Sequence, residues 1–308
     1  FLAFQLRHVD GALARGRGAS RGMVEHYSVT GYLPIDGEKA VRGLLTGADA
    51  VRTGNDAGVH VSTEVWSKAD LHIHSNHSDG VAKIPEIMDY VATQTDLKVI
   101  AITDHNTIEG ALFAKELEDL FAKELEDLYG IEVVIGEEVS STEGHIIGLF
   151  LTEEIPPGLT PAETIRRISE QGGIAIIPHP FSSRGVFGPF GRSAFSAAVS
   201  ELAFHALEVY NSVPYLGWAN RVAAKMFTGG QGIAAVGGSD AHVLHGVGKG
   251  YTVFRGSTAA ELRASIEALE TRAEADRGGL AFALRYAFRI PQIRRQQAWN
   301  WERCKVRA

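Results

Sequence analysis

The stretch ADLHIHSNHSDG, residues 69–80, reads as a short apolar strand followed by imidazole and carboxylate side chains of the kind that can bind metal ions. Alternate side chains of a strand point to the same face, so His72 and His74 are expected to present both imidazoles to one cation. Asp79 stands in the loop beyond the strand and can reach a neighbouring ion. This segment therefore predicts a strand end that holds metal.

From residue 69 onward, short apolar runs alternate with segments of helical periodicity. Strands are expected at 69–72, 98–103, 131–135, 145–151, 174–177, 206–210, 233–236 and 251–254, and helices near 83–94, 107–129, 160–171, 217–228 and 258–271. Such alternation is typical of parallel strands joined by crossover helices. Seven or eight units in roughly 200 residues favour a closed barrel of the α/β class over an open sheet.

Groups of potential ligands recur at or beside the ends of these expected strands. Beyond residues 69–80 they are Thr103–Asn106, Gly136–Ser140, Gly144–Gly148, Ile177–Pro180 and Gly238–His242. The C-terminal ends of all strands in a βα barrel open on one face. Most of these groups stand at such an end, whereas His145 stands at the start of its strand, so its position on the same face has less support. Six imidazoles and three carboxylates that face one cavity would repel or compete as free groups, and bound divalent cations resolve this. Mixed nitrogen and oxygen ligands suit zinc, manganese or iron better than calcium.

The order and spacing of these groups resemble the polymerase and histidinol phosphatase (PHP) domain over residues 69–272. The resemblance implies a distorted seven-stranded, TIM-like β/α barrel with two or three divalent ions, for which magnesium is also possible. It implies one ion on His72, His74, Glu138 and Asp240, a second on Glu138, His145 and His179, and a third on Asp79, His105 and His242. The choice of Glu138 over Glu137 follows from the Gly-x-Glu pattern of the family.

The branch that this chain resembles most is that of the stand-alone phosphoesterases. We therefore expect metal-activated water to hydrolyse phosphate esters of nucleotides, nucleoside bisphosphates or short oligonucleotides, as a phosphatase or an exonuclease. Two alternatives stay open, a metal-dependent amidohydrolase on a similar barrel and a non-catalytic, metal-stabilised binding module. The sequence does not give the natural substrate, the preference for mono- or diesters, the metal or the oligomeric state.

Three further residues are candidates for catalysis. Asp104 is expected to orient a metal-binding histidine, since outer carboxylates commonly do so. Arg184 and Arg192 belong to the glycine-rich loop 181–193, which follows His179 directly. Their guanidinium groups suit phosphate, and solvent-exposed loop arginines are the alternative.

Other polar and aromatic side chains are expected at the same end of the barrel. Glu208 and Asn211 follow the strand 206–210 and are candidates for contacts with a sugar or base. The phenylalanines of the loop either stack on a base or pack the loop onto the barrel; they are Phe181, Phe187 and Phe190.

Charge and composition divide the chain into three parts. Residues 1–68 are rich in glycine and are expected to form a poorly ordered N-terminal extension, whereas residues 69–272 form the domain described above. Residues 70–272 carry 14 basic and 27 acidic residues, which argues against a surface that coats nucleic acid. The basic tail 273–308 is expected to dock on this acidic body as a helix, with binding of RNA or a membrane surface as the alternative.

The remaining features are ordinary for a globular enzyme. The octapeptide FAKELEDL is repeated at 113–120 and 121–128 and predicts one lengthened amphipathic helix. Cys304 is the single cysteine, which excludes an internal disulfide framework and fits a reducing, cytoplasmic setting. No apolar run reaches the length of a membrane span, and the sequence indicates no obligate protein partner.

Overall fold

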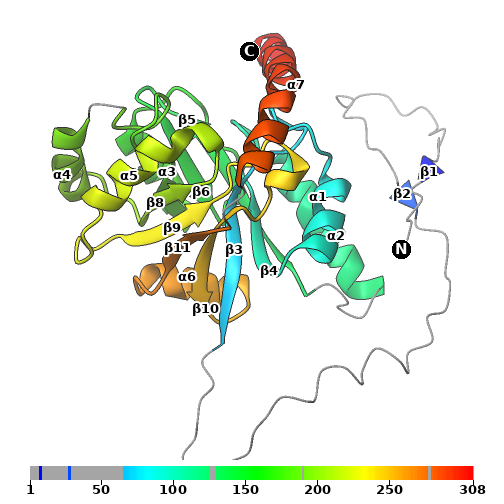
Figure 1. The fold of residues 1–308 in the computed structure, drawn as a ribbon, viewed down its shortest axis with the longest axis horizontal. Helices are drawn as coiled ribbons and strands as arrows, with labels where there is room; N and C mark the ends of the chain where they lie inside the picture. The colour runs from blue at the N-terminus through cyan, green and yellow to red at the C-terminus, as the bar shows by residue number, and fades with distance from the viewer. Residues whose placement is uncertain are drawn as a thin grey trace, which may run out of the picture. The chain divides into compact units, whose positions relative to one another are not determined.

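The computed structural model describes residues 7–8, 27–28, 65–124, 130–188, 191–276 and 279–307 (Figure 1). The chain forms two compact units, Phe1–Val61 and Ser62–Ala308. In the first unit the described residues are β1 (Arg7–His8) and β2 (Tyr27–Ser28), which pair antiparallel. The rest of the N-terminal extension lies outside the described residues. The second unit holds all the candidate ligands.

Nine strands of the second unit form one curved sheet, in the order β11-β10-β3-β4-β5-β6-β7-β8-β9. Their bounds are β3 Trp66–Ile73, β4 Leu97–Ile102, β5 Glu132–Ser140, β6 His145–Leu149, β7 Ile174–Ile177, β8 Ala206–Asn211, β9 Ala234–Gly238, β10 Gly250–Arg255 and β11 Arg272–Ala275. The predicted barrel-like α/β fold is confirmed, with nine strands in place of seven.

The sheet curves until its last strand, β9, returns to β10 and β3. The Thr252 hydroxyl accepts from the Gly237 N–H at 3.0 Å and donates to the Gly237 carbonyl at 2.9 Å. An isolated parallel bridge also joins Ile73 to Ala241. A Cβ atom on Gly237 would lie 2.5 Å from the Tyr251 carbonyl oxygen, so only glycine permits this close approach. The barrel is thus almost closed by contacts outside the regular ladder.

The expectation of parallel strands throughout is wrong at two places. β6 pairs antiparallel with both β5 and β7, and β10 pairs antiparallel with β3 and β11. Only residues 141–144 separate β5 from β6, which is far too short for a parallel crossover. The start of β6 therefore lies beside the end of β5, and this places His145 at the same end of the barrel as Glu138.

Helices surround the strands. They are α1 Ile84–Gln94, α2 Glu109–Glu124, α3 Pro161–Glu170, α4 Arg192–Glu201, α5 Gly217–Met226, α6 Ala259–Glu267 and α7 Gly279–Arg307. Thr160 begins α3 by accepting from the Glu163 N–H at 3.2 Å, and Pro161 fits its first turn. The five expected helices are present, and α4 was not predicted. The second FAKELEDL copy enters α2 as far as Glu124, and residues 125–129 lie outside the described part.

Apolar side chains fill the layers on both sides of the strands. Ile84 and Ile87 of α1 pack with Ile102 of β4, and a second layer lies between β6–β8 and α3–α5. Leu262 and Ile266 of α6 pack against the remaining strand residues. All five of these side chains are at most 1 % exposed, so the scaffold that carries the strand ends is rigid.

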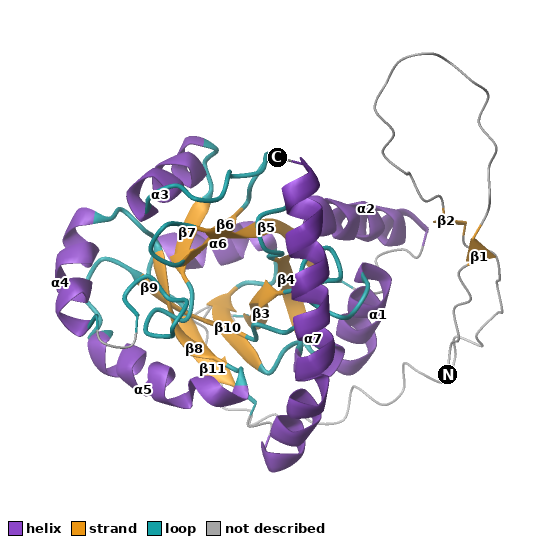
Figure 2. Ribbon diagram, turned by 90° about the horizontal axis from the view of Figure 1, so that it is seen from above, coloured by secondary structure: helices purple, strands orange, loops and turns teal. Residues whose placement is uncertain are grey.

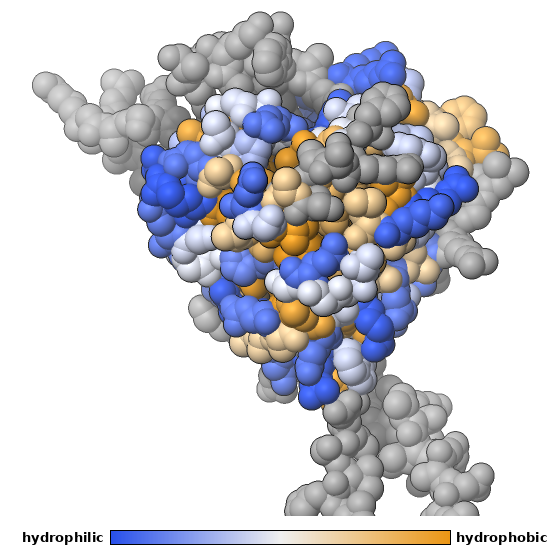
Figure 3. Space-filling view, turned by 90° about the vertical axis from the view of Figure 1, so that its left-hand side faces the viewer, coloured by the Kyte–Doolittle hydropathy of each residue, from blue (hydrophilic) through white to orange (hydrophobic). Residues whose placement is uncertain are grey.

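The tail expected from residue 273 begins inside β11 and continues as the long helix α7. Figure 2 shows α7 running across the strand ends of the barrel. In the described part of the chain, no helix has both the length and the apolar character needed to cross a membrane. The face seen in Figure 3 mixes hydrophilic side chains with smaller apolar areas.

Candidate metal centre

Glu138 lies at the centre of a buried cluster of imidazoles and carboxylates. Its Oε1 atom is 2.8 Å from Nδ1 of His145 and 2.9 Å from Nε2 of His179. Its Oε2 atom is 3.2–3.4 Å from a nitrogen of each of three more imidazoles, those of His72, His74 and His105. One carboxylate thus lies beside five histidines, which come from the ends of four strands, β3, β4, β6 and β7.

Asp240 closes the cluster from the loop after β9. Its Oδ1 atom lies 3.3 Å from Nε2 of His74, 3.4 Å from Nδ1 of His242 and 3.6 Å from Nε2 of His72. Asp240 has φ +50° and His179 has φ +30°, a region that non-glycine residues rarely occupy. Strained backbone of this kind collects at functional sites, where the surrounding structure holds it in place.

Asp79 gathers a second set of imidazoles beside the first. Its Oδ2 atom lies 3.1 Å from Nε2 of His242 and 3.6 Å from Nε2 of His105, and its Oδ1 atom lies 3.6 Å from Nδ1 of His74. His74 therefore stands between Asp79 and Asp240. The nine side chains singled out as ligands in the sequence all lie in this one cluster.

The electrostatic state of the cluster follows from its burial and its imidazoles. Burial alone would raise the pKa of Glu138, but His145, His105 and His72 outweigh it and hold the pKa well below its ordinary value. The pKa values of Asp79 and Asp240 are lowered in the same way. The three carboxylates are therefore ionised at neutral pH, and their charge favours cations in the space between them.

Several imidazole nitrogens of the cluster have no hydrogen-bond partner. They are Nε2 of His72, Nε2 of His74 and Nδ1 of His105, and all three are buried. A buried polar atom without a partner costs about 1–3 kcal/mol, so such atoms call for an explanation. Four groups of these side chains offer ligand atoms within 4.8 Å of one another. The residues therefore fit divalent cations of the kind bound by mixed nitrogen and oxygen ligands.

Glu208 and Asn211 support the cluster from behind. Glu208 Oε1 lies 3.0 Å from Nδ1 of His72, and its Oε2 accepts from the His179 N–H at 2.7 Å. The Asn211 amide donates to Glu208 at 2.9 Å and to Asp240 Oδ2 at 3.1 Å. Both side chains are at most 2 % exposed. Their polar atoms contact His72, His179 and Asp240, and their predicted contact with a sugar or base stays a prediction.

Asp104 is buried below the loop after β3. Its Oδ1 atom accepts from the Ser75 N–H at 2.8 Å and from the Ser78 hydroxyl at 2.5 Å. Its Oδ2 atom accepts from the Ser75 hydroxyl at 2.6 Å. The Ser78 hydroxyl is also 3.5 Å from Nδ1 of His74, so Asp104 reaches a metal-binding histidine only through Ser78.

The loop after β7 covers part of the site. Arg184 is exposed, and its carbonyl accepts from the His145 N–H at 2.9 Å. Arg192 was expected in the loop, but it is the first residue of α4. Phe181 and Phe187 are buried and pack against Phe195, which confirms that they hold the loop down. Phe190 lies outside the described residues.

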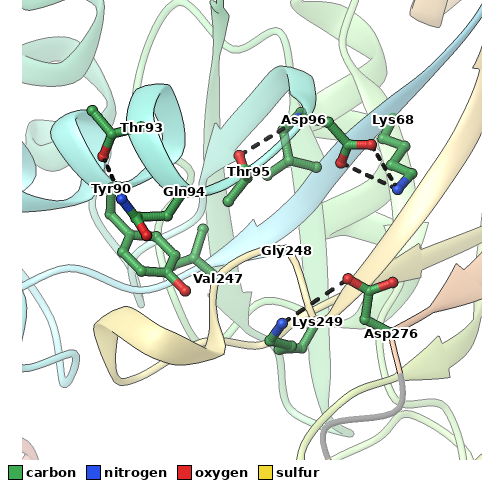
Figure 4. Close-up of a pocket in the computed structure, with 11 residues that line it drawn as sticks. Lys68, Tyr90, Thr93, Gln94, Thr95, Asp96, Val247, Gly248, Lys249 and Asp276 are labelled. Carbon is green, nitrogen blue, oxygen red and sulfur yellow. Dashed lines mark hydrogen bonds and ion pairs between the residues drawn. The ribbon is translucent and has the colours of Figure 1, made fainter.

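A separate pocket lies away from these ligands. Its volume is about 430 Å³, and it is lined by residues that include Lys68, Tyr90 and Lys249 (Figure 4). Lys68 forms an ion pair with Asp96 at 2.8 Å, and Lys249 lies 4.0 Å from Asp276. None of the nine ligands lines this pocket, so it is distinct from the metal centre.

Two family models match the second unit. Residues 70–176 match the model of the PHP domain, and residues 217–271 match a model described as PHP-associated. The first span contains six of the nine ligands, Glu138 among them, whereas His179, Asp240 and His242 lie beyond it.

Similar proteins extend this picture. An uncharacterized protein of Methanocaldococcus jannaschii is 43% identical over 167 residues, 51% of this chain and 88% of the relative. A 5′–3′ exoribonuclease of Haemophilus influenzae is 33% identical over 117 residues, 35% of this chain and 38% of the relative. The solved structure of a two-domain Bacteroides vulgatus protein that contains a predicted PHP-like metal-dependent phosphoesterase has a TM-score of 0.50. It is 21% identical and covers 74% of this chain and 70% of that one, a likeness that concerns the fold.

Proposed function

Because the chain belongs to the PHP family, we propose that it is a metal-dependent phosphoesterase. The observation that carries the proposal is the buried cluster around Glu138, where three carboxylates and six imidazoles bring their ligand atoms together. The finer proposal is that the substrates are phosphate esters of nucleotides, nucleoside bisphosphates or short oligonucleotides. The similarity to a 5′–3′ exoribonuclease supports this class.

The contacts support two or three divalent ions, with manganese, zinc or iron as the proposed metals and magnesium as a further possibility. His72, His74, Glu138 and Asp240 would hold one ion, and Glu138, His145 and His179 a second. The third would lie between Asp79, His105 and His242. Bound ions of this kind lower the pKa of water and neutralise the charge of a phosphate.

The protein's own groups prepare the site for this chemistry. Glu208 fixes the ring of His72 through Nδ1, so that Nε2 points toward the other ligands. Asp104 is proposed as a positioning residue that steadies His74 through Ser78. Arg184 stands exposed beside His145 and is proposed to bind a phosphate oxygen. Arg192 is retained as a weaker candidate for phosphate binding at the start of α4.

A phosphate ester of a nucleotide is an intracellular metabolite, and a single cysteine fits a reducing compartment. We therefore propose a cytoplasmic enzyme whose partners are its phosphorylated substrates.

The test is a screen of nucleotides, nucleoside bisphosphates, short RNAs and cyclic amides with manganese added. The wild type and Asp89→Ala, which removes an exposed carboxylate of α1, should hydrolyse at least one class of these phosphate esters, and Asp240→Ala should hydrolyse none. Turnover of amides alone would replace the phosphoesterase with an amidohydrolase. Manganese binding without turnover of any compound would indicate a metal-stabilised binding module.

A further inference from the structure

The helix α7 packs directly on the loops that carry the ligands. Tyr286 and Ile293 of α7 are buried in one cluster with Val213 and Val243. Val243 follows His242 directly. The Val213 N–H donates to Oδ1 of Asn211, whose amide group donates to Asp240. The N–H of Val81, which packs on the same cluster, donates to the His242 carbonyl at 3.0 Å. The inner face of α7 therefore packs against the loops that follow Asn211 and His242, beside the metal centre.

The rings of two tyrosines contact each other beside these loops. The ring of Tyr286 lies 6.4 Å from the ring of Tyr215, centroid to centroid, with an angle of 65° between the planes. Tyr286 is buried, whereas 68 % of Tyr215 is exposed. The ring contact holds Tyr215 against α7, while most of its side chain stays exposed.

Charged groups of the site act on the hydroxyl group of Tyr215. Partial burial and the negative charge of Asp240 raise the pKa of Tyr215, whereas Arg184 lowers it. Burial and Asp240 also raise the pKa of Tyr286. Both hydroxyl groups are therefore neutral at physiological pH. Tyr215 belongs to the turn Pro214–Leu216, which follows β8 shortly after Asn211, whose amide donates to Asp240.

We propose that Tyr215, held by Tyr286, is a specificity-determining residue that stacks on the nucleobase of the substrate. This inference rests on the proposed phosphoesterase function and deepens it, since it selects nucleotides over phosphate esters without an aromatic ring. An exposed aromatic face beside a phosphate site suits any planar base, because stacking does not depend on the pattern of base donors and acceptors. Tyr215 and Tyr286 both lie outside the residues that match the two family models.

The competing explanation is that the tyrosine pair only stabilises the fold. The preference for a ligand with a base over one without a base distinguishes the two explanations. The dissociation constants of adenosine 5′-monophosphate and ribose 5-phosphate are measured by calorimetry on the manganese-loaded full chain. Both probes carry the same phosphate, and only the first carries a base. The wild type should prefer adenosine 5′-monophosphate by about tenfold, the effect of one base–aromatic stack.

Tyr215→Ala should abolish this preference and leave the affinity for ribose 5-phosphate unchanged. Tyr286→Leu should reduce the preference, and Tyr286→Phe, which keeps the ring but loses the hydroxyl that interacts with Tyr215, should reduce it less. Phe288→Ala is the matched control, because Phe288 is 84 % exposed and two positions from Tyr286, on another face of α7. Equal affinity of the wild type for both probes, or a preference that survives Tyr215→Ala, would overturn the inference.

Hydrolysis measured in parallel separates this inference from the proposed function. Hydrolysis of phosphate esters without a preference for adenosine 5′-monophosphate over ribose 5-phosphate would contradict only the stacking role of Tyr215. A preference for the base that Tyr215→Ala abolishes, without hydrolysis of any phosphate ester, removes only the phosphoesterase.

Discussion

The Nδ1 atom of His72 lies 3.0 Å from Oε1 of Glu208, and both side chains are almost completely buried. A carboxylate at this nitrogen fixes the tautomer that carries the proton on Nδ1, which leaves the lone pair of Nε2 free for a metal ion. Glu208 also accepts from the His179 N–H at 2.7 Å. One carboxylate thus orients two histidines of the centre without being one of the nine ligands itself.

The first prediction concerns this supporting carboxylate. Glu208→Gln should weaken manganese binding by about 10- to 100-fold, the usual cost of losing an outer partner of a metal-binding histidine. Calorimetric titration of the metal-free protein measures the effect. Glu116→Gln removes an exposed carboxylate of α2 and should leave the affinity unchanged. An unchanged affinity in Glu208→Gln would mean that the ring of His72 is held by packing alone.

The second prediction distinguishes two adjacent carboxylates of β5. Manganese should raise the melting temperature of the wild type, because a ligand that binds only the folded state stabilises it by about 2.7 kcal/mol at 100 times its dissociation constant. Glu138→Gln should abolish this shift. Glu137→Gln should keep it, because Glu137 points the other way and accepts from the Ile155 N–H at 2.8 Å.

The pKa of Glu137 supports this choice of control. Burial raises it to about 8, so the side chain is protonated at neutral pH and resembles glutamine in charge. Thermal unfolding with manganese and after treatment with a chelator provides the measurement. A loss of the manganese effect in Glu137→Gln and not in Glu138→Gln would reverse the assignment.

The third prediction tests the close packing behind the centre. A Cβ atom at Gly238 would lie 2.6 Å from Glu208 Oε1 and 2.7 Å from Cβ of His72. Gly238→Ala should therefore lower the free energy of unfolding by about 1–3 kcal/mol and weaken metal binding as well. Gly217→Ala is the control, since its φ of −57° suits alanine and no atom lies within 4 Å. It should stabilise the protein by about 0.4–1 kcal/mol in urea denaturation.

The fourth prediction concerns pH and a histidine far from the ligands. Nδ1 of His205 accepts from the Ala175 N–H at 3.1 Å, and burial is the main cause that lowers its pKa below 6.5. The unfolded chain therefore binds more protons than the folded chain around and below pH 6.5, so the free energy of unfolding rises with pH through this window. Above this pH window, neutral His205 makes its full contribution to the free energy of unfolding.

His205→Ala should cost about 1 kcal/mol at pH 8 and markedly less at pH 5, because the protonated ring no longer accepts the hydrogen bond. His205→Asn, which offers an oxygen near the position of Nδ1, should keep the stability and lose its pH dependence. Urea denaturation at the two pH values decides the matter. An equal cost of His205→Ala at both values would contradict the role given to this hydrogen bond.

The local pattern of the sequence predicted the elements and most of the cluster. Alternating apolar runs and helical periods predicted the strands β3–β10, since both periods depend on neighbours within a few residues. The nine ligands stood out because charged and imidazole side chains interrupt apolar runs at the ends of those runs. The helix α4 escaped prediction, since its alanines and serines carry a weak apolar period.

The direction of β6 and the roles of Glu208 and Asn211 could not be read in the same way. Strand direction depends on the length of a connection and on the partner it meets, so His145 was placed with less support than His72. Glu208 follows a strand as the ligands do, and only its contacts with His72 and His179 show that it stands behind them. Burial of a polar side chain is a property of the whole fold.

The amino-acid sequence by itself determined which residues are able to hold metal, because that ability belongs to imidazole and carboxylate groups wherever they stand. Only the tertiary structure decided that Glu138 meets five imidazoles and that Tyr286, more than 140 positions later, packs beside the same site. These contacts join segments distant in the chain, and their distances depend on how the nearly closed sheet brings β9 back to β3 and α7 across the strand ends.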